Sequence, residues 1–378
     1  MFGFGRRKSK DARGSVPGPD ASAVPDAPVA QPAPTESAEQ VVPGPVEAPL
    51  AANALQLVAA GAGLTALCTG TTVWLHSGAL GLGELDLVDI DLRVEVGGSS
   101  QEPLAHGAVM DWYGVLDGMD PLDVQRLVNG WNDRFVGPRV YSWRDGQGHL
   151  RIRGEIVMTW WRGHTVAQVD DFLRVVVSAA LNLSEWLEEQ WPSVDRLTPE
   201  TVPPENGVAL TGDDRGLEET ERLAAQFVTP GNPFGLLKAE TAPVTADRIA
   251  DLFAARSGQR SQVSDDGVLR IRWGEPAVDI AVHDAVLTIS SGAEVMVADP
   301  EQIPDSLLEV TWKWSTNRAG AVAVVHREQN GPTFLVYALH QFVGMGMSDG
   351  QLAMTASRTC ELVADCMIEL AGEITGGR

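Results

Sequence analysis

Cysteine is scarce in this chain, whose 378 residues include only Cys68, Cys360 and Cys366. Three thiols cannot build a disulfide framework, and the spacing of Cys360 and Cys366 on a helical pattern does not place them on one face. Such cysteines are typical of buried positions in a reducing compartment. The composition therefore predicts a cytoplasmic protein with reduced, mostly buried thiols.

Positive charge is also in short supply. The chain has 28 Lys and Arg residues against 51 Asp and Glu residues, which gives a formal net charge of -23. A nucleic-acid-binding domain needs a cationic surface to displace counterions from phosphates. We therefore expect no nucleic-acid partner; the acidity favours a partner with a basic face, or serves solubility alone.

Motifs for metal binding and catalysis are missing from the sequence. Its histidines form none of the spacings that hold zinc; they are His76, His106, His149, His164, His283, His326 and His340. We expect them to be exposed in turns or hydrogen-bonded in the core. The Gly-containing stretch 61–72 lacks the lysine of a phosphate-binding loop. The sequence thus predicts no catalytic residue, metal or cofactor and argues against an enzyme, although a catalytic set drawn from distant residues leaves no spacing signature.

No stretch combines the length and apolarity of a membrane-spanning helix. Residues 50–75 carry no charge, but they are rich in Ala, Gly and Thr, and the glycines at 61 and 63 favour the end of a helix. A helix followed by a strand is the better interpretation. We expect no stable insertion into a membrane.

The N-terminal start MFGFGRRKSK is basic but is not followed by the apolar segment of a signal peptide. Proline, alanine and serine dominate the residues that come next, and such a composition cannot pack a core. Residues 1–49 are therefore predicted to be a disordered tail. A weaker hypothesis is marginal attachment to a membrane surface through the two phenylalanines and four cations of this start.

The most informative pattern is an internal repeat. Trp131 and Trp314 are 183 residues apart, and at this offset RVYSWRDGQGHLRIRGEI (139–156) lies over VAVVHREQNGPTFLVYAL (322–339). Both segments are typical of two strands around a polar, glycine-containing turn. A helix follows in each copy and is opened by a capping box, in which hydroxyl and amide satisfy backbone donors. The two boxes are Thr165 with Gln168, and Ser348 with Gln351.

A helix and strand-like runs precede each hairpin. In the second copy the helix TADRIADLFAARSG is followed by GVLRIRW, AVDIAVHD and AVLTISSG; in the first copy LAANALQLVAAGAG is followed by TTVWLHS and LVDIDLRVEV. Residues 98–120 then break the constant offset and are interpreted as an insertion.

The sequence thus predicts an α+β fold of two tandem domains, residues 50–192 and 244–376, each in the order helix, antiparallel strands, helix, β-hairpin, helix. Residues 193–243 are predicted to be a linker with a short helix near 217–227.

The string WNDRFVGPRVYSWRDGQGHLRIRGEI, followed by a capped helix that ends EWLEEQWP, resembles the YbjN family. The second copy keeps the Trp but displaces the Asn to Asn317. Members of this family are grouped as candidate bacterial sensory transduction regulators, and their fold is similar to that of type III secretion chaperones. The resemblance implies a binding or regulatory protein of a dimerising fold and brings no catalytic residues.

Two hypotheses apply to the Trp-Asn step. In the functional one, Trp131 and Asn132 contact a ligand. In the structural one, which recurrence of the Trp at Trp314 favours, Trp131 fills the core and its indole N–H finds a backbone carbonyl. Asn132 then bonds nearby backbone.

A second candidate site is the strand face opposite the predicted core. It carries Arg151, Arg153 and Glu155 in the first copy and Phe334, Val336, Ala338 and Phe342 in the second. An apolar outer face needs a cover, so we predict that it meets the other repeat, a second chain or a client segment. Residues 292–304 or the linker are an alternative cover.

The resulting hypothesis is a non-enzymatic protein-binding module, regulatory or chaperone-like. The alternative is a small-molecule sensor or an enzyme with a pocket between the two domains.

Overall fold

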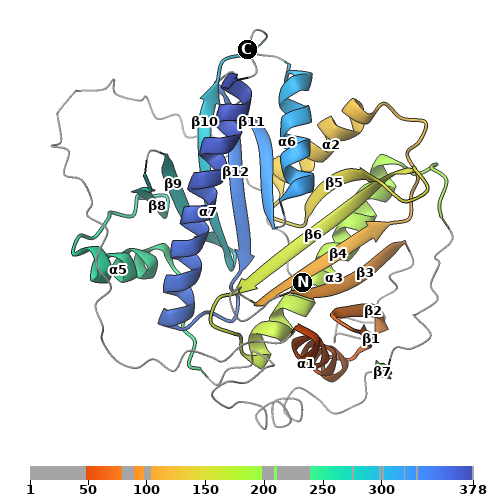
Figure 1. Ribbon diagram of the computed structural model, residues 1–378, viewed down its shortest axis with the longest axis horizontal. Coiled ribbons are helices and arrows are strands. Elements are labelled where there is room, and N and C mark those ends of the chain that lie inside the picture. The colour runs from red at the N-terminus through yellow and green to blue at the C-terminus, as the bar shows by residue number, and fades with distance from the viewer. Residues whose placement is uncertain are drawn as a thin grey trace.

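The computed structural model describes residues 48–78, 89–97, 104–197, 208–210, 239–274, 276–297, 299, 302–318, 320–328 and 331–376. These residues form helices and two antiparallel sheets (Figure 1), so the predicted α+β class is confirmed. Each half follows the predicted order of helix, strands, helix, β-hairpin and helix.

The two sheets share one strand order. The first runs β5-β6-β4-β3-β2-β1-β7 and the second runs β11-β12-β10-β9-β8. The first sheet contains β1 (Leu64–Thr69), β2 (Thr72–Gly78), β3 (Ile90–Gly97), β4 (Leu104–Trp112), β5 (Arg139–Arg144), β6 (Leu150–Trp160) and β7 (Val208–Leu210). The second contains β8 (Val268–Arg272), β9 (Ala277–His283), β10 (Val286–Val295), β11 (Ala321–Arg327) and β12 (Thr333–Phe342). The order from β5 to β2 thus recurs from β11 to β8, and β1 and β7 extend one edge of the first sheet.

The helices cover one face of each sheet and fill the space between the halves. α1 (Ala48–Gly61) and α3 (Val166–Gln190) pack on the first sheet, and α5 (Ala246–Ser257) and α7 (Asp349–Gly376) pack on the second. α2 (Pro121–Arg134) and α6 (Asp305–Asn317) lie side by side between the sheets (Figure 1). In that view the first sheet lies in front of α3, whereas the second lies behind α7. The outer faces of the sheets, opposite these helices, therefore point in different directions.

Local sequence signals explain where these helices begin and end. The Asp120 carboxylate accepts the Leu122 N–H at 2.9 Å, and Pro121 occupies the first turn of α2. Both predicted capping boxes are present; the Gln168 Oε1 accepts the Thr165 N–H at 2.9 Å, and the Gln351 Oε1 accepts the Ser348 N–H at 2.9 Å. These caps fix the starts of α3 and α7, which come close together at the junction of the halves.

The apolar spacing of the sequence defines two cores. Strand β6 alternates buried and half-buried side chains, and its inward residues include Leu150, Ile152 and Ile156. α3 buries the apolar stripe expected of it, from Val169 through Leu187. The second half has its own cluster around Leu335, Tyr337 and α7.

Three expectations need comment. The segment 98–120 is not simply an insertion, because it contains β4, which holds the place of β10 in the strand order. The segment predicted as a linker contains β7, which pairs with β1. The predicted tail, apart from its last two residues, and the predicted helix near 217–227 lie outside the described residues. No helix in the described part of the chain has the length and apolarity to cross a membrane.

Candidate functional site

The two halves meet about an approximate twofold axis. A small cavity between α2 and α6 is lined by residues of both helices and of β5 and β11. Most of the lining forms five pairs whose members are 183 residues apart: Gln125 and Leu308, Val128 and Thr311, Asn129 and Trp312, Asn132 and Ser315, and Val140 and Ala323. Each half therefore presents the same surface to the other, as in an isologous dimer interface.

Hydrogen bonds across the junction follow the same symmetry. The Asn129 amide donates to the Val325 carbonyl at 3.0 Å and accepts the Val325 N–H at 2.9 Å. At the related position, the Trp312 indole donates to the Ser142 carbonyl at 2.8 Å. Each helix thus satisfies backbone groups on the edge strand of the opposite half, which closes those positions to strand addition.

The Trp-Asn step is structural in its contacts. The buried Trp131 donates its indole N–H to the Pro138 carbonyl at 2.9 Å. Asn132 exchanges two 2.8 Å hydrogen bonds with the backbone of Val140. Ser315, rather than Asn317, repeats this exchange in the second half, where its hydroxyl bonds the backbone of Ala323 at 3.3 and 3.2 Å.

The capping glutamines have a second role. The Gln168 Nε2 donates to the Gly346 carbonyl at 2.7 Å, and the Gln351 Nε2 donates to the Gly163 carbonyl at 2.8 Å. The two side chains also meet, with 3.1 Å between the Gln351 Nε2 and the Gln168 Oε1. Each amide therefore uses its oxygen to cap its own helix and its nitrogen to hold the other half.

A groove opens beside this junction. It holds about 690 Å³ of empty space, its open mouth included, and lies between the end of α2 and the outer face of the second sheet. The chain from Asn132 to Val136 forms one wall. The apolar side chains at its base form a cluster separate from both cores; they are Val322, Val324, Val336 and Ala338. The lining combines apolar side chains with a few polar ones, as is common in binding grooves.

Polar groups lie around this base. Thr288 and Ser290 of β10 line the groove, and the Thr288 Oγ1 lies 3.0 Å from the His340 Nδ1. At the mouth the His326 Nδ1 lies 2.8 Å from an Asp133 carboxylate oxygen. The groove therefore offers hydrogen-bonding groups, which can orient a bound molecule, in addition to apolar side chains.

Small apolar residues beside the groove replace large polar ones of the first half. In the second sheet Val322 is directly opposite Ala338, and Val324 is opposite Val336. The same positions in the first sheet hold the pairs Arg139–Glu155 and Tyr141–Arg153. Those long side chains fill the space that the second half leaves open.

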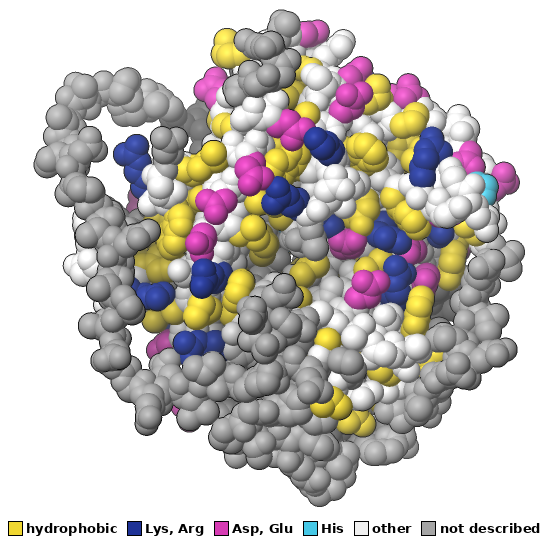
Figure 2. All heavy atoms as spheres, in the orientation of Figure 1, with side chains coloured by type: hydrophobic (Ala, Val, Ile, Leu, Met, Phe, Trp, Pro, Cys, Tyr) yellow, Lys and Arg dark blue, Asp and Glu magenta, His cyan; other side chains and the backbone are white. Residues whose placement is uncertain are grey.

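The outer face of the first sheet is a network of ion pairs. Figure 2 shows Lys or Arg and Asp or Glu side chains intermingled over β3, β4 and β6. Asp111 accepts hydrogen bonds from Arg153 at 2.6 and 2.9 Å and from Arg93 at 2.8 Å. Burial opposes ionisation of Asp111, but these two guanidinium groups lower the pKa of its carboxyl. The Arg153 guanidinium also lies 4.0 Å from the centre of the Trp143 ring.

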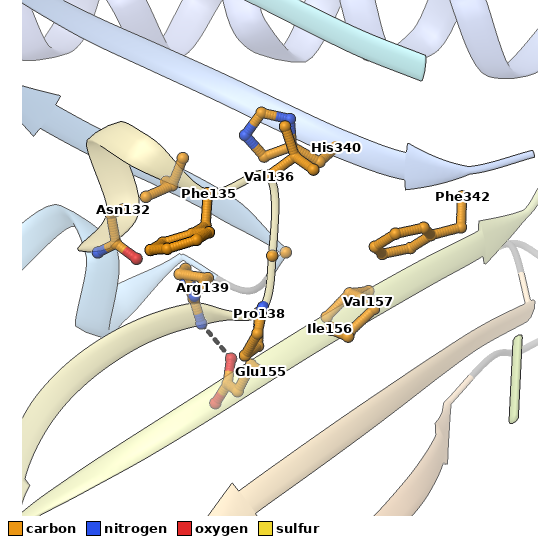
Figure 3. Close-up of a pocket in the computed structure, with 13 residues that line it drawn as sticks. Asn132, Phe135, Val136, Pro138, Arg139, Glu155, Ile156, Val157, His340 and Phe342 are labelled. Carbon is orange, nitrogen blue, oxygen red and sulfur yellow. Dashed lines mark hydrogen bonds and ion pairs between the residues drawn. The ribbon is translucent and has the colours of Figure 1, made fainter. Parts of the chain in front are cut away.

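Of the three residues predicted for an interaction face, two lie near the groove and one lies in the junction. Val336 lines the groove, and the half-buried Phe334 lies two residues before it in β12. Phe342 is buried and belongs to the core cluster of the first half. Figure 3 shows it reaching over β6 near Val157, on the other side of Pro138 and Ile156 from the Arg139–Glu155 ion pair. The predicted face is thus covered by the other half at one end and open at the other.

Two histidines depart from expectation. His106 of β4 and His164 are buried, with ring centroids 4.9 Å apart, and both ring nitrogens of His106 lack a hydrogen-bond partner among the described residues. Burial lowers the pKa of His106 to about 3, and burial together with His106 lowers the pKa of His164. Among the described residues, no cluster of three or more His, Cys, Asp or Glu side chains is arranged to hold a metal.

Comparison with known proteins gives a distant structural match and no match to a family model or a curated protein. No model of a known protein family matches the chain, and no curated protein matches its sequence. The solved structure of YbjN from E. coli, described as a candidate transcription regulator, is similar to it at 16% sequence identity and a TM-score of 0.30. The match covers 36% of this chain and 96% of YbjN. It names the family that the sequence motifs resemble, and at this TM-score it carries no statement about function.

Sequence reasoning missed the residues that join the halves. Asn129 and Trp312 are separated by the repeat offset, but they are different residue types, so similarity between the two segments does not identify them as equivalent. Glu155 was placed on the outer strand face, but its partner Arg139 was visible only as part of a hairpin. A comparison of single residues at the offset of 183, rather than of residue classes, could have matched each of these residues with its counterpart in the other half.

Proposed function

We propose that this chain is a non-enzymatic, cytoplasmic binding module, regulatory or chaperone-like, in which two copies of one unit form an intramolecular pair. Its groove holds an apolar segment of a client protein. The observation that carries the proposal is the loss of four large polar side chains from one face of an otherwise symmetric pair, which leaves an apolar base beside a rigid junction. Val322, Val324 and Ala338 are buried at the base of the groove, and the half-buried Val336 is the apolar side chain of this cluster that a client segment can contact.

The proposal is tested by filling the groove with the residues that the first half already uses. The Val322→Arg/Ala338→Glu double variant restores the directly opposed pair of Arg139 and Glu155. Because the same pair fits the same backbone elsewhere in the molecule, the variant is expected to fold. Val336→Glu is a simpler second variant that places one charge at the base.

The binding measurement uses photo-cross-linking in native cytosol. A benzoylphenylalanine at Phe334 reports on the groove, and one at Arg151, the matching position of the first sheet, is the control. We expect one protein to be captured from Phe334, not from Arg151, and to be lost in the folded double variant. Equal capture by the double variant, or equal capture from Arg151, contradicts the proposal.

A small-molecule sensor is the second candidate function. The hydroxyls of Thr288 and Ser290 and the ring of His340 line one side of an apolar groove, which favours a small-molecule ligand. Thermal shift against a metabolite set, with the double variant beside the wild type, distinguishes the two. A small molecule that stabilises the wild type alone, with no protein captured, favours the sensor.

A further inference from the structure

The buried histidine pair of the first half lies in an apolar part of the core. The ring centroids of His106 and His164 are 4.9 Å apart, and the Phe172 centroid lies 5.8 Å from that of His106. Met158, directly opposite His106 in the sheet, is buried as well. Within the described part of the chain, no group bonds either nitrogen of His106 or the Nδ1 of His164. These surroundings favour the neutral imidazole.

Among the described residues, no charged side chain compensates a proton on either ring. The charged residues of β3 and β6 alternate with the inward ones and lie on the outer face of the sheet. On α3, Asp170 is bound by Arg174 at 2.8 Å, and Asp171 accepts a backbone N–H of the second half. Burial alone lowers the pKa of His106, and burial together with His106 lowers the pKa of His164.

The segment that carries His164 also joins the two halves. It consists of the end of β6 and the turn after it, residues 159–164, and leads directly into the capped start of α3. Its contacts with the second half include the Gln341 Nε2 to the Thr159 carbonyl at 3.4 Å, the Gln351 Nε2 to the Gly163 carbonyl at 2.8 Å, and the Arg358 guanidinium to the centre of the Trp161 ring at 5.9 Å. Any movement that brings the histidines into water therefore disturbs the junction.

Acid favours such a movement. Once exposed to water, each imidazole regains its ordinary pKa near 6.5, so below that pH the open form takes up protons that the closed form does not. The equilibrium constant for opening then rises by up to about tenfold per pH unit for each histidine.

We infer that residues 159–164 form an acid-sensitive contact between the two halves. On acidification this segment leaves β4, and the halves separate where α3 and α7 begin. Because both halves line the groove, separation also dismantles the groove. The inference concerns the chain alone and does not require that the groove bind a client.

The test is hydrogen exchange of the full chain at pH 7.5, 6 and 5, with each rate corrected for intrinsic exchange at that pH. We expect the protection factors of the amides in 159–168 and 343–352 to fall by up to about 100-fold from pH 6 to pH 5, since two imidazoles take up protons. At pH 5 they should lie below those of β9, whose amides exchange when the second core unfolds.

The matched control is His106→Leu/His164→Met, which introduces the residues that the second half has at these positions, Leu287 and Met347. Its protection factors in both segments should not fall between pH 6 and pH 5. His164→Met alone keeps one histidine and should show a fall of up to about tenfold. A double variant that responds to acid as the wild type does, or equal protection of these segments and β9 at pH 5, overturns the inference.

Discussion

The outer faces of the two sheets have the same backbone and opposite chemistry. On the first, Asp111, Arg93 and Arg153 form ion pairs with little exposure, and Arg139, Glu155 and Tyr141 extend the network toward the junction. On the second, four Val and Ala residues form an apolar cluster beside a groove. The difference teaches that one strand arrangement accommodates either a charged network or a small apolar cluster at the same positions.

The energetic consequences differ as well. A buried charge is tolerable only while its partners are in place, so the first face depends on every member of the network. The second face depends on no polar partner, and Val322, Val324 and Ala338 are buried there without any charge. Loss of one charged residue therefore affects the first face more than loss of one methyl group affects the second.

The largest effect is expected when the network of the first face is broken. Asp111→Ala leaves Arg153 and Arg93 without their shared carboxylate, which is expected to cost about 3 kcal/mol of unfolding free energy in urea titration. The control on the second sheet is Asp279→Ala, which removes the exposed Arg270 pair and should cost less than about 1 kcal/mol. Equal losses would mean that the buried network contributes no more than a surface pair.

The next effect concerns the symmetric contact that both halves share. Gln168→Met removes the cap of Thr165 and the bond to the Gly346 carbonyl, and we expect a loss of about 2 kcal/mol. Thr165→Ala removes only the cap and should cost about 1 kcal/mol. Combining Gln168→Met with Gln351→Met should cost less than the sum, since the two amides touch. Strict additivity would show that they act independently.

A third prediction uses the second half as the template for the first. The sheet registers place Leu287 at the position of His106, and Met347 lies at the repeat offset from His164. Both replacements are buried in the second core. The folded histidines stay neutral while the unfolded chain takes up protons below the ordinary pKa near 6.5. The unfolding free energy is therefore unaffected by these histidines above that pH, and it decreases as the pH falls below it.

Below pH 6 the unfolding free energy falls with pH with a slope of at most about 1.4 kcal/mol per pH unit for each histidine. His106→Leu/His164→Met should flatten this slope in urea titrations at pH 7.5, 6 and 5. The exposed His283→Gln change should leave the wild-type slope unaltered. A double variant as acid-sensitive as the wild type contradicts the assignment.

The smallest stability change is expected from the transplanted pair. Val322→Arg/Ala338→Glu should shift the unfolding free energy by about 1 kcal/mol, because the Arg139–Glu155 pair fits the same backbone positions with little exposure and the attraction of the two charges offsets much of their desolvation. Val322→Arg alone lacks the carboxylate and should be less stable than the double variant. Differential scanning calorimetry checks both, and a single variant as stable as the double one would show that the two side chains do not pair.

Much of this fold was predictable from the sequence, for physical reasons. Period-two alternation in β6 and β12 and the helical stripe of α3 follow directly from burial of one face. The capping boxes depend on residues three positions apart, so they are readable as strings. β4 was missed because its counterpart lies at an offset of 181 rather than 183, after a loop of different length.

The site was predictable only in part. The apolar outer face with Val336 was visible as a strand pattern, but its neighbour α2 comes from the other half, nearly 200 residues earlier. Spacing along one chain cannot reveal a contact of that kind. Asn129 illustrates the limit, since its partner Val325 is named by no local signal.

The twofold arrangement inside one chain has a consequence for how such a protein can change. In a dimer of identical subunits, every substitution appears twice, so a new cavity on one face opens a matching cavity on the other. In this protein the two faces are encoded by different parts of one chain, so a substitution in one does not appear in the other. One can keep the ion pairs that hold the molecule together while the other accumulates substitutions that suit a partner, and neither change is imposed on its counterpart.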